Sequence, residues 1–134
     1  MFACRTVISY NQIMPYEIFW EARGVYKRFK GFVAIQDYLR SQESVLGDRR
    51  CDDIRYIIND FLGVEGYSVT SDDAEYSAVI TRGASLSNPR IRIAYVTTDT
   101  KIILVIKLVS KLSSFELKIF STLAAAREWV DAIV

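Results

Sequence analysis

The closing stretch of this chain, residues 115–130, most constrains its fold and reads FELKIFSTLAAAREWV. Alternating apolar and polar residues at its start predict a short strand, and the alanine-rich run after it predicts an amphipathic helix. Between the two, Ser121 or Thr122 can accept a hydrogen bond from a free amide of the first helical turn. This unit indicates a kind of fold and describes no reaction.

The same alternation of strands and helices runs through most of the chain. Apolar patterns predict strands over residues 4–13, 16–20, 24–29, 54–61, 90–97 and 115–120. Helices are expected over residues 32–46, 70–86, 101–112 and 123–133. The segment 101–112 also suits a strand, but the cap-like residues before it favour a helix. Residues 62–69 are expected to form a loop. This order predicts an α/β fold with a mixed, mostly parallel sheet and about four helices.

Length and composition predict one domain over residues 1–134, with residues 1–15 as an N-terminal extension or edge strand. A chain of this length buries about two-thirds of its unfolded surface in one core. The net charge of +1 gives no basic excess for nucleic acid, so we expect no nucleic-acid partner. The longest apolar run, residues 102–109, is far too short to span a membrane, so we expect no membrane insertion.

The chain contains no histidine, which removes histidine-dependent nucleophile pairs and nearly all zinc sites. Cys4 and Cys51 lack metal or redox spacing and are expected to be reduced thiols of a cytoplasmic protein. The pairs Asp52–Asp53 and Asp72–Asp73 lack the loop spacing of a calcium site. We therefore expect no metal, no cofactor and no enzymatic activity. An enzyme using Asp60 with Tyr67 or Lys101 is the weakest alternative.

Several phrases of the chain resemble small bacterial proteins related to STAS domains. These phrases are WEARGVYKRFKG at residues 20–31, RYIINDF at 55–61, LSNP at 86–89 leading into IAYVTTD at 93–99, and the closing stretch. Together they extend over about residues 16–134. The resemblance implies a SpoIIAA-like fold and generally non-enzymatic relatives.

The resemblance also implies two kinds of function. Sporulation-type relatives are phosphorylation-controlled partners of anti-sigma kinases, and they carry Asp-Ser-Ser-Gly at the corresponding helix start. Here residues 66–73 read GYSVTSDD instead, so the motif is absent. The wider fold includes lipid-binding proteins with a cleft beneath a mobile helix, which here corresponds to residues 70–86.

Five residues near predicted strand ends and helix starts are candidates for a ligand cleft: Asp60, Tyr67, Thr97, Thr98 and Asp99. Asp60 ends a predicted central strand, where open α/β sheets place ligand sites, and its carboxylate suits a cation or polar ligand. An acid that caps a turn is the simpler interpretation and is favoured. The hydroxyls at 97 and 98 suit anion binding at a helix start, although capping is their commoner use.

Ser68, Thr70 and Ser71 are candidate phosphoacceptors, but helix capping is again favoured for hydroxyls before two acids. A phosphate beside Asp72 and Asp73 would meet like-charge repulsion. The resemblance to STAS-related proteins and the lack of any catalytic constellation imply a regulatory protein-interaction module that binds a protein partner or forms a homodimer. The alternative, from a different class, is a carrier of a small apolar ligand or lipid beneath the helix at residues 70–86.

Overall fold

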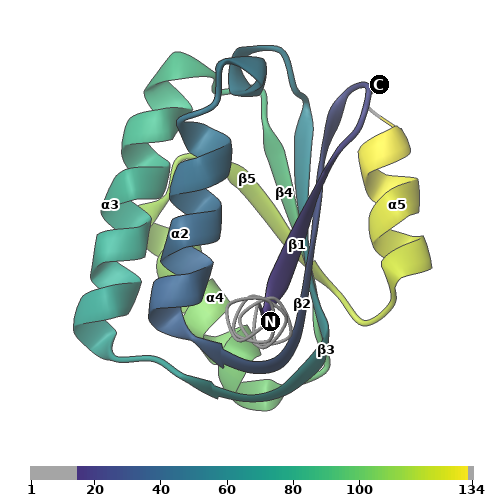
Figure 1. Ribbon diagram of the computed structural model, residues 1–134. Helices are drawn as coiled ribbons and strands as arrows, with labels where there is room; N and C mark the ends of the chain where they lie inside the picture. Colours follow the sequence, from purple (N-terminus) through teal and green to yellow (C-terminus); the bar gives the residue numbers. More distant parts are fainter. Residues whose placement is uncertain (1–14, 133–134) are drawn as a thin grey trace, which may run out of the picture.

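Strands and helices alternate along the computed structural model, which describes residues 15–132 (Figure 1). The strands are β1 (Tyr16–Trp20), β2 (Gly24–Ala34), β3 (Tyr56–Ser68), β4 (Arg92–Val96) and β5 (Glu116–Phe120). The helices are α2 (Ile35–Leu46), α3 (Ser71–Ser87), α4 (Thr100–Leu112) and α5 (Leu123–Asp131), with a 3-10 turn at Arg49–Asp52. The strand predicted at residues 4–13 lies outside the described residues.

The strands form one sheet in the order β1-β2-β3-β4-β5. β1 is antiparallel to β2, and every other neighbouring pair is parallel. Helices α2, α3 and α4 cover one face of this sheet, and α5 covers the other (Figure 1). The predicted α/β class, with a mostly parallel sheet and four helices, is therefore confirmed.

Side-chain alternation along the central strands divides the core into two layers. Ile57 and Ile93 point toward α2 and α4, whereas Ile58, Ala94 and Val96 pack against Ala126 and Val130 of α5. Strands covered on both faces carry apolar residues on both faces, which explains the apolar runs in the sequence of β3 and β4.

The predicted loop at residues 62–69 is wrong, because β3 continues as a strand to Ser68. Its partner β2 also continues beyond its predicted end, and pairing runs as far as Ala34 opposite Ser68. The extension passes through Gly31, whose φ of 69° is favourable only for glycine, and through two register shifts. Helix α2 consequently begins at Ile35 rather than at residue 32.

Local capping contacts set the starts of the last two helices. The side chain of Asp99 accepts hydrogen bonds from the amides of Lys101 and Ile102, which satisfies the first turn of α4. The helix favoured over residues 101–112 is therefore confirmed. In the closing unit, Thr122 rather than Ser121 is the cap and accepts from the amide of Ala125.

A partly buried ion pair holds α5 against the rest of the fold. Arg127 donates to both carboxylate oxygens of Glu21 at 2.6 and 2.7 Å. The Tyr56 hydroxyl donates to the same carboxylate. These contacts, led by the hydrogen bond from Arg127, hold the pKa of Glu21 below its ordinary value of 4.5. The closing helix is thus joined to the turn after β1, far away in the sequence.

Replacing Arg127 with alanine is expected to lower the free energy of unfolding at neutral pH by about 1–3 kcal/mol, because a partly buried carboxylate loses a bidentate partner. Urea unfolding measures this. The matched control is Arg28→Ala, which removes an exposed pair with Glu17 and should cost less than about 1 kcal/mol.

The loss of unfolding free energy in Arg127→Ala should also depend on pH. A carboxylate whose folded pKa is lowered stabilises the protein above its unfolded pKa, and this contribution disappears as pH falls through the folded value. The difference between wild type and Arg127→Ala should therefore shrink below about pH 4. Equal effects of the two arginine variants at neutral pH would contradict the assignment.

Candidate ligand-binding pocket

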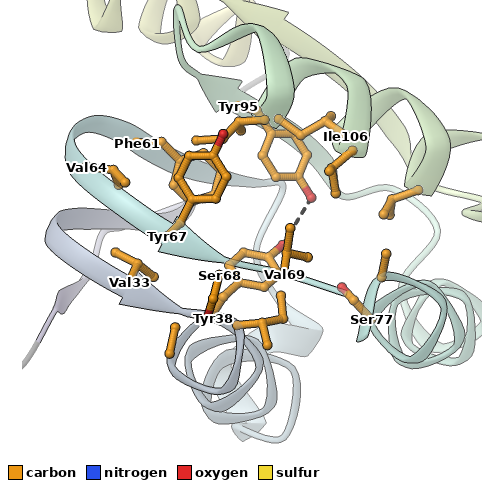
Figure 2. A pocket seen from close by; sticks show the side chains of 16 residues that line it. Val33, Tyr38, Phe61, Val64, Tyr67, Ser68, Val69, Ser77, Tyr95 and Ile106 are labelled. Carbon is orange, nitrogen blue, oxygen red and sulfur yellow. Dashed lines mark hydrogen bonds between the residues drawn. The ribbon is translucent and has the colours of Figure 1, made fainter. Parts of the chain in front are cut away.

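A pocket of about 100 Å³ lies where the extended ends of β2 and β3 meet α2, α3 and α4 (Figure 2). A single water molecule needs about 10–15 Å³ by comparison, so the pocket holds a group of several atoms. Sixteen residues line it: Val33, Ala34, Ile35, Tyr38, Phe61, Val64, Tyr67, Ser68, Val69, Ala74, Ser77, Tyr95, Ile102, Val105, Ile106 and Val109.

The lining is aliphatic and aromatic, and none of its residues carries a charge. Its polar groups include the hydroxyls of Tyr38 and Tyr95, whose oxygens lie 3.2 Å apart and share one hydrogen bond (Figure 2). Burial raises the pKa of both tyrosines, so both hydroxyls stay protonated at neutral pH. The pocket therefore offers an apolar surface with hydrogen-bonding hydroxyls on one side.

The pocket exists because α3 presents small side chains to the sheet. Ala74, Ser77 and Ala78 are buried along its inner face. Its large apolar side chains point outward, with Tyr76 and Val79 53% and 69% exposed. A helix with this arrangement cannot fill the layer between itself and the sheet. The wall opposite α3 is the extended part of β3, which carries Val64 and Tyr67 (Figure 2).

A buried polar cluster lies on the far side of Tyr38 and Tyr95. The Lys27 side chain of β2 is buried, and its ammonium donates to the hydroxyl of Ser41 at 3.1 Å. Its nitrogen lies 5.0 Å from the ring centre of Tyr38. Among the described residues no carboxylate forms an ion pair with Lys27, and burial lowers the pKa of its amine to about 7.

Neighbouring polar groups complete this cluster. The Gln42 amide donates to Thr81, and Ser77 donates to Gln42, which joins α2 to α3. Asn59 lies opposite Lys27 in the β2–β3 register, and its side-chain oxygen has no hydrogen-bond partner within residues 15–132. A second, much smaller cavity of about 10 Å³ lies among these groups and shares Tyr38 and Tyr95 with the main pocket.

The structure brings two of the candidate cleft and phosphoacceptor residues to the pocket, namely Tyr67 and Ser68. The Tyr67 hydroxyl donates to Asp99 at 2.8 Å, so Asp99 joins the wall of the pocket to the start of α4. Thr97 is buried, and its hydroxyl accepts from the amide of Asp99. Thr98 is exposed and does not line the pocket.

Asp60 lies away from the pocket. Its position in β3 places it on the α5 face of the sheet with Ile58. Its carboxylate accepts hydrogen bonds from the Tyr26 hydroxyl at 2.6 Å and from the amide of Leu62 at 3.0 Å. Both carboxylate oxygens therefore have structural partners, but Asp60 caps no turn, because β3 continues through it to Ser68.

The helix start that carries the other candidate hydroxyls is a capping site in the structure. The Thr70 hydroxyl accepts from the amide of Asp73 and donates to its carboxylate. Ser71 is the first residue of α3, and nothing is described of its side chain. Within residues 15–132 no group of three acidic or cysteine side chains is placed to hold a metal ion.

The sequence interpretation missed Lys27, Tyr38 and Tyr95. Lys27 stands between Tyr26 and Arg28 in a strand with several charged residues, so its sequence gives no sign of burial, whereas the structure buries it under α2. The repeat of Ala74, Ser77, Ala78 and Thr81 at helical spacing was a usable signal for a thin inner face on α3.

Comparison with known proteins identifies the architecture. No protein-family model matches the chain, and no curated protein matches it in sequence. Among solved structures, the SpoIIAA anti-sigma factor antagonist in its unphosphorylated form aligns with a TM-score of 0.57 and 13% identity, over 88% of this chain and 96% of that one. The chain has a SpoIIAA-like fold.

Two further solved structures share this SpoIIAA-like fold. An uncharacterised protein of the DUF3478 family from Shewanella loihica PV-4 aligns with a TM-score of 0.53 and 16% identity, over 86% of this chain and 91% of that one. An anti-sigma factor antagonist from Mycobacterium paratuberculosis aligns with a TM-score of 0.52 and 13% identity, over 87% of this chain and 92% of that one. The resemblance inferred from the sequence is confirmed at the level of the fold.

Replacing Lys27 with methionine tests the buried amine. We expect the free energy of unfolding to rise by about 1–3 kcal/mol near pH 6, because a desolvated cation is replaced by an apolar chain of similar length. Ser41 keeps a partner, since its hydroxyl also donates to the carbonyl of Tyr38. Urea unfolding measures the change, with Lys30→Met at an exposed position as the control.

The sign of the pH dependence follows from the lowered pKa. Between the folded value of about 7 and the ordinary 10.5, the unfolded chain binds the proton that the folded chain has lost, so wild-type stability rises with pH. The advantage of Lys27→Met should therefore narrow between about pH 7 and pH 9. If the difference in unfolding free energy between Lys27→Met and the wild type stays constant over this range, the Lys27 amine is solvated and the assignment is wrong.

Proposed function

We propose that this protein binds a small apolar or amphipathic molecule in the pocket beneath α3. The observation that carries the proposal is the pocket itself, an opening lined by sixteen residues with no charged side chain among them. It lies toward the carboxyl ends of the parallel strands, where open α/β sheets place their ligands. Concave, mostly apolar sites with a few polar groups are the usual form of small-molecule sites.

The chemistry of the lining restricts the ligand. Aliphatic side chains from α4 and β3 favour an alkyl or aromatic body, which loses water-exposed surface on entering. The hydroxyl pair of Tyr38 and Tyr95 can hydrogen-bond an oxygen of the ligand. A compact molecule with one polar end fits these features better than a sugar or nucleotide, which needs many polar partners.

We also propose that the protein is a binding protein and not an enzyme. No histidine is present in the chain. The phenols of Tyr38 and Tyr95 have raised pKa values and are poor nucleophiles at neutral pH. Cys51, the free cysteine of the described residues, is buried in the core away from the pocket lining. We further propose a cytoplasmic location, where thiols stay reduced.

Replacing Val64 with tryptophan tests the pocket. Val64 is a half-buried wall residue, so a larger ring there fills the cavity without entering the main core. We expect binding of a fluorescent naphthalene sulfonate probe to weaken at least about tenfold, or about 1.4 kcal/mol. Fluorescence titration measures this, and native mass spectrometry of the wild type identifies any ligand carried through purification.

The matched control for this experiment is Val79→Trp, which makes the same change at an exposed position on the outer face of α3. It should bind the probe as tightly as the wild type. If both tryptophan variants bind equally well, the probe does not occupy the pocket and the proposal fails at this site.

A second candidate function is regulatory binding to a protein partner or to a second copy of the chain. Support comes from the SpoIIAA-like fold shared with two anti-sigma factor antagonists and from exposed apolar side chains such as Tyr76, Val79 and Leu86 on α3. Affinity purification from the native host, compared with an empty bait, tests this function. Recovery of no specific partner, together with a monomer in solution, would count against it.

A further inference from the structure

Helix α4 carries apolar side chains on two faces. On its inner face, Ile106 and Val109 are buried and line the pocket, and Figure 2 shows Ile106 there. On its outer face, Leu104, Leu108 and Leu112 are 62%, 50% and 47% exposed. With about 100° per residue, residues four apart lie almost in line along a helix. These three leucines, the leucine ridge, therefore form one continuous apolar strip over the outside of α4.

Basic residues lie at one end and along one side of the leucine ridge. Lys101, Lys107 and Lys111 are all exposed, and α4 contains no acidic residue. At about 100° per residue, Lys101 falls in line with the ridge at its N-terminal end, and the other two lysines fall along one side. Helix α3 differs in this respect, because its first two turns carry Asp72, Asp73 and Glu75. The combination of exposed leucine and lysine is thus particular to α4.

We propose that the leucine ridge of α4 docks on the surface of a lipid bilayer that contains anionic headgroups. The leucines enter the boundary between headgroups and acyl chains, and the lysine stems lie along the interface with their ammonium groups on the phosphates. An apolar strip with a basic border and no acidic residue has the charge complementarity of an anionic lipid surface. A protein partner would have to supply an acidic rim around an apolar groove to match it.

This inference rests on the proposed function, because it connects the surface with the pocket. Ile102, Val105, Ile106 and Val109 of the same helix form one side of the pocket. Docking through the outer face of α4 would bring the pocket within one helix diameter of the membrane, a suitable place to exchange an apolar ligand. The described helices include none long and apolar enough to cross a bilayer, so the contact is peripheral and reversible.

The test is co-sedimentation of the full chain with vesicles of phosphatidylcholine alone and of phosphatidylcholine mixed with phosphatidylglycerol. The wild type should sediment with the anionic vesicles and much less with the neutral ones, and added salt should weaken the binding. The double variant Leu104→Glu/Leu108→Glu should bind at least about tenfold more weakly. Lys107→Gln/Lys111→Gln should reduce the preference for anionic vesicles.

The control is Val79→Glu/Leu86→Glu, which places the same charges at exposed apolar positions on α3. It should sediment like the wild type, and circular dichroism should show that every variant is folded. Equal loss in the α3 control, or no binding of the wild type to anionic vesicles, would overturn the proposal. So would a wild-type dimer that the α4 leucine variant converts to a monomer, because the ridge would then be an interface between copies.

Titration with the naphthalene sulfonate probe in the absence of vesicles separates this proposal from the pocket. The α4 surface variants should keep the probe affinity of the wild type. Probe binding without vesicle binding would leave the proposed function standing and remove the docking surface. Vesicle binding that follows the leucine ridge, with no probe binding in the pocket, would support docking and count against the pocket.

Discussion

The parallel pairing of β2 with β3 determines where the pocket of this molecule lies. β3 pairs with β4 only as far as Asp60 opposite Val96, whereas its pairing with β2 continues to Ala34 opposite Ser68. Beyond β4 the sheet is a two-stranded ribbon, and such a ribbon needs packing partners to be stable. The starts of α2 and α3 and the side of α4 provide them. The pocket is the part of this layer that their side chains leave open.

The sequence predicts most of the elements but misses this ribbon, and the reason lies in its glycines. Gly63 and Gly66 interrupt the apolar alternation and therefore suggest a loop. In the structure both serve close packing: a Cβ atom on Gly63 would lie 3.0 Å from the carbonyl oxygen of Phe29, and one on Gly66 would lie 3.1 Å from the ring of Phe32. Glycine here marks the close approach of two strands, which only the partner strand reveals.

In the candidate site, too, the sequence predicts the local contacts and misses those between distant elements. The capping roles of Thr70 and Asp99 are local, so hydroxyl and acid positions before an apolar run were sufficient to predict the helix starts. The direction of the Asp60 side chain depends instead on the alternation of side chains along β3. This alternation turns Asp60 toward Tyr26 and α5 rather than toward the pocket. Burial of Lys27 depends on where α2 lies over the sheet. Both features depend on contacts between elements far apart in the chain, so the residues around Asp60 and Lys27 in the sequence do not predict them.

The two faces of the sheet differ in how completely they are packed. On the α5 face, Ile58, Ala94, Ala126 and Val130 are fully buried together, and the Arg127–Glu21 pair closes the edge. On the other face, α3 contributes alanine, serine and threonine to the interior. A helix that buries small side chains adds little packing to its layer. The pocket lies on this loosely filled face of the sheet, while the α5 face is closely packed.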